Sequence, residues 1–260
     1  MAIGFVPVDL GPGVLAGFST RSGGFSDEPW NAANLGLGVN DDPDRVHANR
    51  GLLAEWIGAP VHFARQIHGT DVLVVGAEGV EQQRRRPLGV SRGEAVADGL
   101  VTDVPGVALG VLVADCVPVL LADPVSGAAG VAHVGRRGLV GGIVQRTIEA
   151  LVALGARPAD LRAVVGPGAG GCCYEVPEQL RAEVAAAVEG SSSITTWGTP
   201  SLDLPAGAAA VLRDHGVRDI ERLSACTVTD RRFYSYRRDG VTGRFAGVVR
   251  TRPASPREER

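Results

Sequence analysis

Residues 112–147, LVADCVPVLLADPVSGAAGVAHVGRRGLVGGIVQRT, place a cysteine beside an aspartate inside an apolar stretch. Two apolar, β-rich runs, 106–115 and 118–124, lie on either side of Cys116 and predict two strands with a break between them. A third apolar run closes at His133, just before a glycine- and arginine-rich turn. The question is therefore whether this cysteine and this histidine pack in a core or belong to one reactive site.

Helical patterns lie on both sides of these strands. Residues 139–156 predict one helix with an apolar stripe formed by Val140, Ile143, Val144, Ile148, Leu151 and Val152. Residues 41–59 predict another, in which Asp41 or Asp42 caps the start, Pro43 suits the first turn, and Val46, Leu53, Trp56 and Ile57 share a face. Further helices are expected within 177–190 and 205–217. Strands mixed with helices predict an α/β or α+β protein.

The remaining segments predict strands and loops. Residues 62–75 are interpreted as a strand, a tight turn and a second strand, and 161–171 as a strand entering a glycine loop. Residues 232–250 are interpreted as a hairpin that ends in a strand. The polar stretch 78–99 lacks periodicity and is expected to be a loop, and the tail 251–260 is expected to be disordered. No composition break divides the chain, so one domain over 1–250 is predicted.

Composition excludes several classes of protein. The chain has 260 residues and a formal net charge of -3, which gives no electrostatic case for binding nucleic acid or an anionic membrane. No run reaches the ~18 apolar residues of a membrane span, and the N-terminus lacks a secretory signal pattern. Four cysteines are too few for a disulfide scaffold at this length. A cytoplasmic protein with free thiols is expected.

Three side chains could meet at the ends of the predicted strands. His68 and His133 end apolar runs at glycine turns, and Cys116 lies at a third such end. Two imidazoles and one thiolate supply three ligands for Zn²⁺ and leave a fourth position open, as in catalytic zinc sites. The alternative from the residues alone is a buried thiol beside hydrogen-bonded core histidines, because free cysteine packs as a small hydrophobe.

Asp115 is the most informative neighbour of this group. On an unbroken strand it would point away from Cys116, so both belong to one site only if the strand breaks there, which Pro118 favours. It is then a candidate proton carrier or a partner of the ligands. The alternative is a turn aspartate that binds local backbone amides.

Glycines and arginines near the turns predict an anion site. Gly135 and Gly138 precede the expected helix, whose first amides attract anions such as phosphate, and Arg136 and Arg137 strengthen that tendency. Arg21 and Arg244 lie near other turns, where each taken singly is most simply a surface charge. The adjacent pair Cys172 and Cys173 is interpreted as packing, because neighbouring cysteines rarely form a strain-free disulfide.

Eight segments together resemble the laccase-domain, YfiH-like family of purine nucleoside phosphorylases. They are STRSGGFS, NLGLGVNDDPDRVHANR, RQIHG with ADGLVT, ADCVPVLLAD, AHVGRRG, GPGAGGCCYEV and CTVTDRRFYSYRRDGVTGR, and they span residues 19–244. The resemblance implies a single-domain α+β fold, a layered α/β/β/α sandwich with mixed sheets. It also implies zinc held by His68, Cys116 and His133, these three and Asp115 being the catalytic candidates.

The implied substrates are purine nucleosides and phosphate. The family resemblance implies phosphorolysis of adenosine, inosine, guanosine and methylthioadenosine, and hydrolytic deamination of adenosine. The candidate substrate- and phosphate-binding residues are Arg21, Arg136, Arg137, Gly138 and Arg244. This chain departs from the family pattern AHAGWRG, because Val134 replaces an alanine and Arg136 replaces a tryptophan. Ala208 stands where the family usually has an asparagine.

Three alternatives remain open from the sequence. The first is an amidase that edits peptidoglycan precursors, using either Cys116 as a nucleophile or zinc. The second is a copper polyphenol oxidase, since two histidines and a cysteine also form the equatorial set of a blue-copper site. It lacks the usual axial methionine, because Met1 is the only methionine in the chain. The third is a metal-binding protein without activity, an alternative that the charge of Arg136 keeps open.

Overall fold

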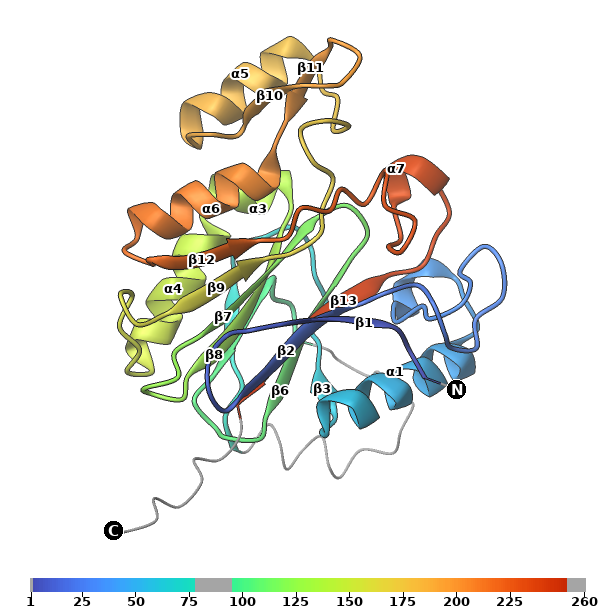
Figure 1. Ribbon diagram of the computed structural model, residues 1–260, viewed down its shortest axis with the longest axis vertical. Helices are drawn as coiled ribbons and strands as arrows, with labels where there is room; N and C mark the ends of the chain where they lie inside the picture. The colour runs from blue at the N-terminus through green and yellow to red at the C-terminus, as the bar shows by residue number, and fades with distance from the viewer. Residues whose placement is uncertain (1, 78–94, 252–260) are drawn as a thin grey trace.

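The computed structural model describes residues 2–77 and 95–251, which form two mixed sheets packed face to face with helices on the outer sides (Figure 1). In order across the first sheet, the strands are β1 (Phe5–Val8), β2 (Val14–Ser19), β13 (Phe245–Thr251), β6 (Ala108–Val113) and β3 (Val61–His62). The second sheet consists of β12 (Asp219–Arg222), β9 (Arg162–Val165), β7 (Val117–Ala122), β8 (Ala129–Val134), β5 (Gly99–Thr102) and β4 (Val72–Val74). In each sheet, parallel pairing is found at an outer strand and the central pairs are antiparallel.

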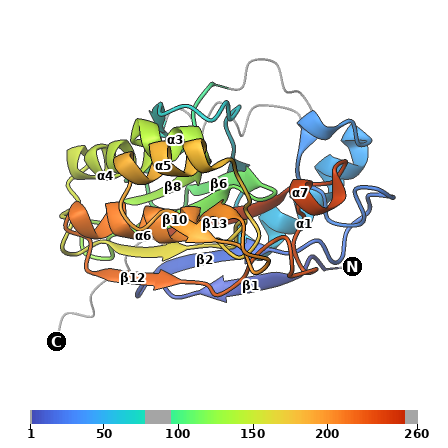
Figure 2. The same cartoon turned by 90° about the horizontal axis from the view of Figure 1, so that it is seen from above.

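The helices cover the outer faces. Their bounds are α1 (Pro43–Ile57), α3 (Arg136–Gly141), α4 (Ile143–Ala153), α5 (Glu178–Ala187), α6 (Leu204–Asp214) and α7 (Tyr236–Asp239), with a 3₁₀ turn η1 (Leu37–Val39). A small hairpin, β10 (Ser192–Ile194) and β11 (Pro200–Leu202), lies beside α5. Seen from above, α3, α4 and α5 lie along one side of the molecule and β1 and β2 along the other (Figure 2).

Alternation of side chains along the strands builds the layers. In β7, Val119 and Leu121 face the α4 and α6 layer, whereas Leu120 faces the other sheet. In β13, Phe245 joins the core between the sheets and Val248 packs in the α1 layer. All five side chains are fully buried. The predicted single-domain α/β/β/α arrangement with mixed sheets is confirmed.

Helix α1 forms as its local signals predict. Asp42 caps it by accepting a hydrogen bond from the Asp44 amide at 2.9 Å, and Pro43 occupies the first position. The helix ends at Gly58, whose φ of 75° suits glycine. Of the predicted face, Val46, Leu53 and Ile57 are buried, and half-buried Trp56 stacks on Phe5 with 3.9 Å between ring centroids.

The prediction of one continuous helix over 139–156 is wrong. Gly142 has a φ of 97°, which ends α3 and separates it from α4. Because of this break, Val140 in α3 does not continue the apolar stripe of α4 and is 45% exposed. Val152, near the end of α4, is 44% exposed. The other four stripe residues are buried as predicted.

Two further predictions are corrected by the paired strands. Residues 232–250 do not form a hairpin, because Ser235 caps the short helix α7 with its hydroxyl and β13 pairs with β2 and β6 instead. The strands expected around His68 exist, but β3 and β4 lie in different sheets. The expected loop over 78–99 falls mostly outside the described residues, as does the tail beyond Thr251.

Candidate metal centre and surrounding cavity

Strand register brings Cys116 and His133 together. Cys116 ends the 114–116 segment, where the chain passes from β6 in one sheet to β7 in the other. In the antiparallel β7–β8 pair, Pro118 lies opposite His133 and Val117 opposite Val134. The residue before Val117 therefore lies next to the end of β8. The strand breaks at 114–116 and not at Pro118, which is paired within β7.

His68 completes the group from a separate turn. Its Nε2 lies 3.6 Å from Cys116 Sγ, and the ligand atoms of His68, Cys116 and His133 all lie within 4.8 Å of one another. The two imidazole rings are 4.8 Å apart at 68°. The structure thus places the three predicted metal-site residues at one point.

Asp98 organises both histidines, a role that was not predicted from the sequence. Its carboxylate accepts hydrogen bonds from the backbone amides of Ile67 at 3.1 Å, His68 at 2.9 Å and Gly69 at 2.7 Å. His133 Nδ1 donates to the same carboxylate at 2.7 Å, so its Nε2 is the atom left for a metal. Asp98 is 1% exposed and directly precedes β5. The one sequence signal is an aspartate before an apolar run in ADGLVT.

Two of the three turns at the centre have left-handed backbone conformations. His68 has a φ of 60° and Asp115 a φ of 96°, which side chains other than glycine rarely adopt. Asp98 fixes the conformation at His68 by accepting hydrogen bonds from the three consecutive amides of residues 67–69. The second is held because the Asp115 carbonyl accepts a hydrogen bond from Ala169 N at 2.8 Å. Such conformations persist where the surroundings impose them, often at functional sites.

The buried charges support one another. Burial opposes ionisation of Cys116, but the His133 charge and hydrogen bonds from both histidines lower the pKa of its thiol to about 6. Burial likewise opposes the charge on His133, but Cys116 and Asp98 raise the pKa of its imidazole to about 9. Despite its burial, Asp98 has a pKa lowered to about 2 by His133 and the amides of Gly69 and Ile67. The metal-free chain therefore favours a thiolate, an imidazolium and a carboxylate side by side.

Asp115 lies next to the centre but binds other groups. One carboxylate oxygen accepts from the Thr227 hydroxyl and the other from the Arg237 amide, each at 2.7 Å. It lines the same cavity as Cys116. Asp98, rather than Asp115, is the partner of the histidines.

A cavity of about 1070 Å³ opens beside the three candidate ligands. Among the described residues that line it are six arginines and a single acid, Asp115; the arginines are Arg50, Arg65, Arg136, Arg137, Arg237 and Arg244. Such an excess of positive charge favours an anionic ligand. The guanidinium of Arg237 lies 4.7 Å from the centre of the Tyr174 ring, and both side chains line the cavity.

The predicted anion-binding residues do not all reach this cavity. Arg136, Arg137 and Arg244 line it, and burial lowers the pKa of Arg244. Arg21 does not: its guanidinium donates to Asn31 and lies 3.7 Å from Asp239. Gly138 is buried where a Cβ would come within 3.1 Å of the Gly69 carbonyl, which makes it a packing residue. Arg50 and Arg65 line the cavity although no sequence signal indicated them.

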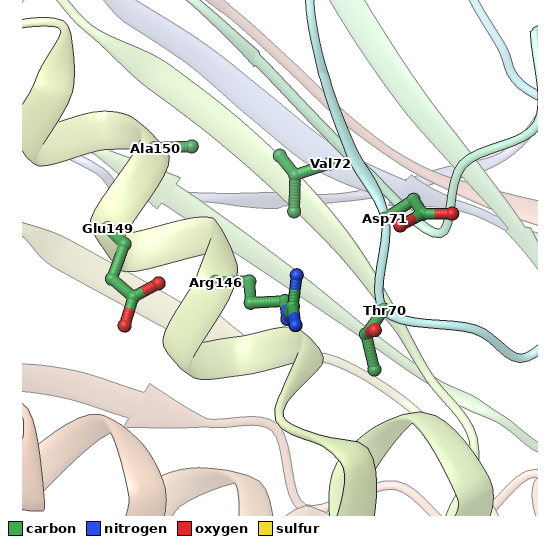
Figure 3. Close-up of a pocket in the computed structure, with 6 residues that line it drawn as sticks. All are labelled: Thr70, Asp71, Val72, Arg146, Glu149 and Ala150. Carbon is green, nitrogen blue, oxygen red and sulfur yellow. The ribbon is translucent and has the colours of Figure 1, made fainter.

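A second hollow, of about 480 Å³, lies between α4 and residues 70–72. Figure 3 shows its lining: Thr70, Asp71, Val72, Arg146, Glu149 and Ala150. It contains none of the predicted site residues.

The donor set fits zinc. Two imidazole nitrogens and one thiolate are common zinc ligands, and three protein ligands leave a position open toward the cavity. The carboxylate–histidine contact of Asp98 with His133 is the usual support of such a ligand. The site is therefore suited to a metal ion.

The fold and site define a mixed-sheet protein with a candidate two-histidine, one-cysteine metal centre beside an arginine-lined cavity. The family model described as multi-copper polyphenol oxidoreductase laccase matches residues 15–252. The chain belongs to this family. Within residues 2–77 and 95–251, no helix has the length and apolar character needed to traverse a membrane.

Relatives support the same assignment. The chain is 48% identical over 235 residues to purine nucleoside phosphorylase ORF3 of Streptomyces griseus, covering 89% of this chain and 92% of that protein. It is 48% identical over 240 residues to a purine nucleoside phosphorylase of Streptomyces coelicolor, covering 91% and 95%. The crystal structure of the Bacillus licheniformis hypothetical protein YfiH has a TM-score of 0.83 at 32% identity, covering 92% of this chain and 93% of that one. The predicted YfiH-like, laccase-domain family is confirmed.

Proposed function

We propose that this protein is a zinc-dependent purine nucleoside enzyme. It catalyses phosphorolysis of adenosine, inosine, guanosine and methylthioadenosine, and hydrolytic deamination of adenosine. The observation that carries the proposal is the meeting of His68, Cys116 and His133 beside a cavity lined by six arginines. The names of the relatives, purine nucleoside phosphorylases, support the substrate class.

His68, Cys116 and His133 would hold the zinc. When bound, the ion supplies Lewis-acid chemistry at the cavity wall. Asp98 keeps both histidines in place, by binding the His68 turn through its amides and His133 through Nδ1. Without these contacts the ligands would have to be ordered at the moment of binding, at a cost in affinity.

The arginines would bind phosphate. Phosphorolysis breaks the bond between the purine nitrogen and C1′ of the ribose and forms a bond from a phosphate oxygen to C1′, while the departing purine takes up a proton. Arg136 and Arg137 lie at the start of α3, close along the chain to His133, and Arg244 lines the same cavity. Arginine forks match phosphate oxygens in pairs. With only six residues, α3 is too short for its dipole to carry this role, so the side chains do.

Deamination places a different demand on the cavity. Water adds at C6 of adenosine and ammonia leaves, so a proton must move from the water to the departing nitrogen. Asp115 is our candidate for this transfer, because its carboxylate lines the cavity beside Cys116. Thr227 and Arg237 fix the position of that carboxylate through its two oxygens.

The test is a product assay with zinc-loaded protein. Adenosine with phosphate should give adenine and ribose 1-phosphate, and adenosine without phosphate should give inosine. His68→Ala should abolish both and lower the bound zinc, whereas the control His215→Ala, at the end of α6, should change neither. Absence of product from all four nucleosides with one zinc per chain would refute the assignment.

One alternative is favoured by a specific observation. In the metal-free chain Cys116 and His133 form a thiolate–imidazolium pair, which resembles the nucleophile and base of a cysteine hydrolase such as an amidase. The two functions differ in their response to zinc. Zinc removal should abolish nucleoside turnover, but it should activate a cysteine hydrolase by freeing its thiolate.

A further inference from the structure

Three cysteines outside the candidate zinc site form a second cluster. The sulfur atoms of Cys172, Cys173 and Cys226 all lie within 4.8 Å of one another, and those of Cys172 and Cys173 are 3.1 Å apart. All three thiols are free. Their positions in the sequence, one adjacent pair and a third cysteine far along the chain, gave no indication that they meet.

The backbone holds the three sulfurs over one glycine. Gly170 N donates a hydrogen bond to Cys226 Sγ at 3.3 Å, and the Gly170 carbonyl accepts from Cys173 N at 3.0 Å. A Cβ placed on Gly170 would lie 3.6 Å from Cys172 Sγ and 3.8 Å from Cys226 Sγ. Gly168 and Cys226 also form a parallel bridge, which fixes the two segments to each other. Backbone hydrogen bonds between the two segments therefore bring the three sulfur atoms together.

We propose that Cys172, Cys173 and Cys226 bind a soft, thiophilic d¹⁰ cation, Cu(I), as a second metal site. Thiolate sulfur selects Cu(I) over hard cations. At a metal–sulfur distance of about 2.3 Å, three sulfurs around a trigonal ion are about 4.0 Å apart. The observed range, from 3.1 Å to at most 4.8 Å, spans that value.

The ligand number distinguishes Cu(I) from zinc at this cluster. Structural zinc is almost always held by four protein ligands. In the part of the chain that the structure describes, no histidine, aspartate or glutamate joins the three sulfurs as a fourth ligand. Cu(I) is satisfied by two or three sulfur donors. A disulfide between the adjacent Cys172 and Cys173 is less favoured, because neighbouring cysteines rarely meet the required geometry.

The cluster lies next to residues that line the large cavity or hold its Asp115 in place. Thr227, next to Cys226, donates its hydroxyl to Asp115, and Tyr174, next to Cys173, lines the cavity. Ala169 both lines the cavity and binds the Asp115 carbonyl. An ion that joins residues 172–173 to Cys226 would therefore stiffen two segments that position Asp115 and Tyr174.

The experiment measures Cu(I) binding to the whole 260-residue chain already loaded with one zinc per chain. Under anaerobic, reducing conditions, Cu(I) is delivered from its bathocuproine disulfonate complex and the remaining complex is followed by absorbance. The protein should take up one Cu(I) per chain while retaining its zinc. X-ray absorption of that copper should show sulfur neighbours only.

Variants separate this site from the zinc site. Cys226→Ser should weaken Cu(I) binding by more than about 100-fold, since loss of a residue that only hydrogen-bonds to a metal ligand already lowers affinity roughly 10- to 100-fold. Ser193→Ala is the control, because Ser193 lies near Gly171 but offers no sulfur ligand. This variant should bind Cu(I) as the wild type does. Cys116→Ser should lose zinc and keep the all-sulfur copper site. Zinc displacement by Cu(I), no uptake, nitrogen or oxygen neighbours, or wild-type affinity in Cys226→Ser would each overturn the proposal.

Discussion

Replacing Asp98 with asparagine tests the organisation of the candidate metal centre most directly. The carboxylate accepts four hydrogen bonds, three from the amides of Ile67, His68 and Gly69 and one from His133. An asparagine offers one oxygen and turns an NH₂ group toward donors, so at least one buried donor loses its acceptor. The two histidines then lose their shared support while the side-chain volume stays the same.

The expected loss of stability in Asp98→Asn follows from the pKa of Asp98. Its lowering from 3.8 to about 2 corresponds to about 2 kcal/mol by which the fold prefers the charged carboxylate. This contribution is present above the unfolded pKa of 3.8 and is lost as the pH falls through about 2. Metal-free Asp98→Asn should therefore be about 2 kcal/mol less stable at pH 7, and the difference should shrink as the pH falls from 4 toward 2.

Two measurements check this prediction. Urea unfolding of metal-free protein at several pH values gives the stability difference, and competition with a chromophoric chelator gives zinc affinity. We expect zinc to bind about 10- to 100-fold more weakly. Asp103→Asn, an exposed change near the same strand, is the matched control. Zinc affinity within about twofold of wild type, together with unchanged stability at pH 7, would refute the role given to Asp98.

In metal-free protein, iodoacetamide should modify Cys116 with a rate that rises with pH and is half-maximal near its pKa of about 6, whereas zinc should protect it; a midpoint near 9 would contradict the thiolate. Gly135→Ala should weaken zinc binding about tenfold or more with the fold retained, because the added Cβ would lie 2.7 Å from His68 Cδ2; unchanged affinity by chelator competition would show that the ring can move. Leu120→Ala should lower the free energy of unfolding by about 2–5 kcal/mol in urea titrations, since the side chain is fully buried between the sheets; a loss below about 1 kcal/mol would mean that the core closes over the cavity.

Local signals in the sequence were sufficient for the elements whose determinants are local. Helix α1 follows from Asp42, Pro43 and its apolar spacing, all within one segment. The predicted hairpin over 232–250 is wrong because Ser235 provides a helix cap that outweighs the strand-forming residues around it. The break at Gly142 was not predicted, because an apolar stripe does not reveal that one glycine has a positive φ.

The three candidate metal ligands could be predicted from residue type, but the residues that hold them in place could not. His68, Cys116 and His133 are suggested by scarce ligand-forming residues at the ends of apolar runs. Asp98 also lies beside an apolar run, but its role was not predicted because that role depends on amides about thirty positions away along the chain. Arg50 lies in α1 and lines the cavity together with residues from several other elements. It is likewise brought there by the packing of α1. Such tertiary contacts have no local signature.

The register of two strand pairs sets the geometry of the candidate metal centre. The β7–β8 pairing places His133 opposite Pro118 and hence beside Cys116, and the β8–β5 pairing places Ala132 opposite Gly99, so that Asp98 meets His133. The His133 amide confirms the second contact, because it donates to the Asp98 carbonyl at 2.7 Å. A slip of one residue in either pair would turn His133 to the opposite face. The buried alternation of β7 and β8 opposes such a slip, so the same apolar residues that stabilise the sheet also keep the ligands together.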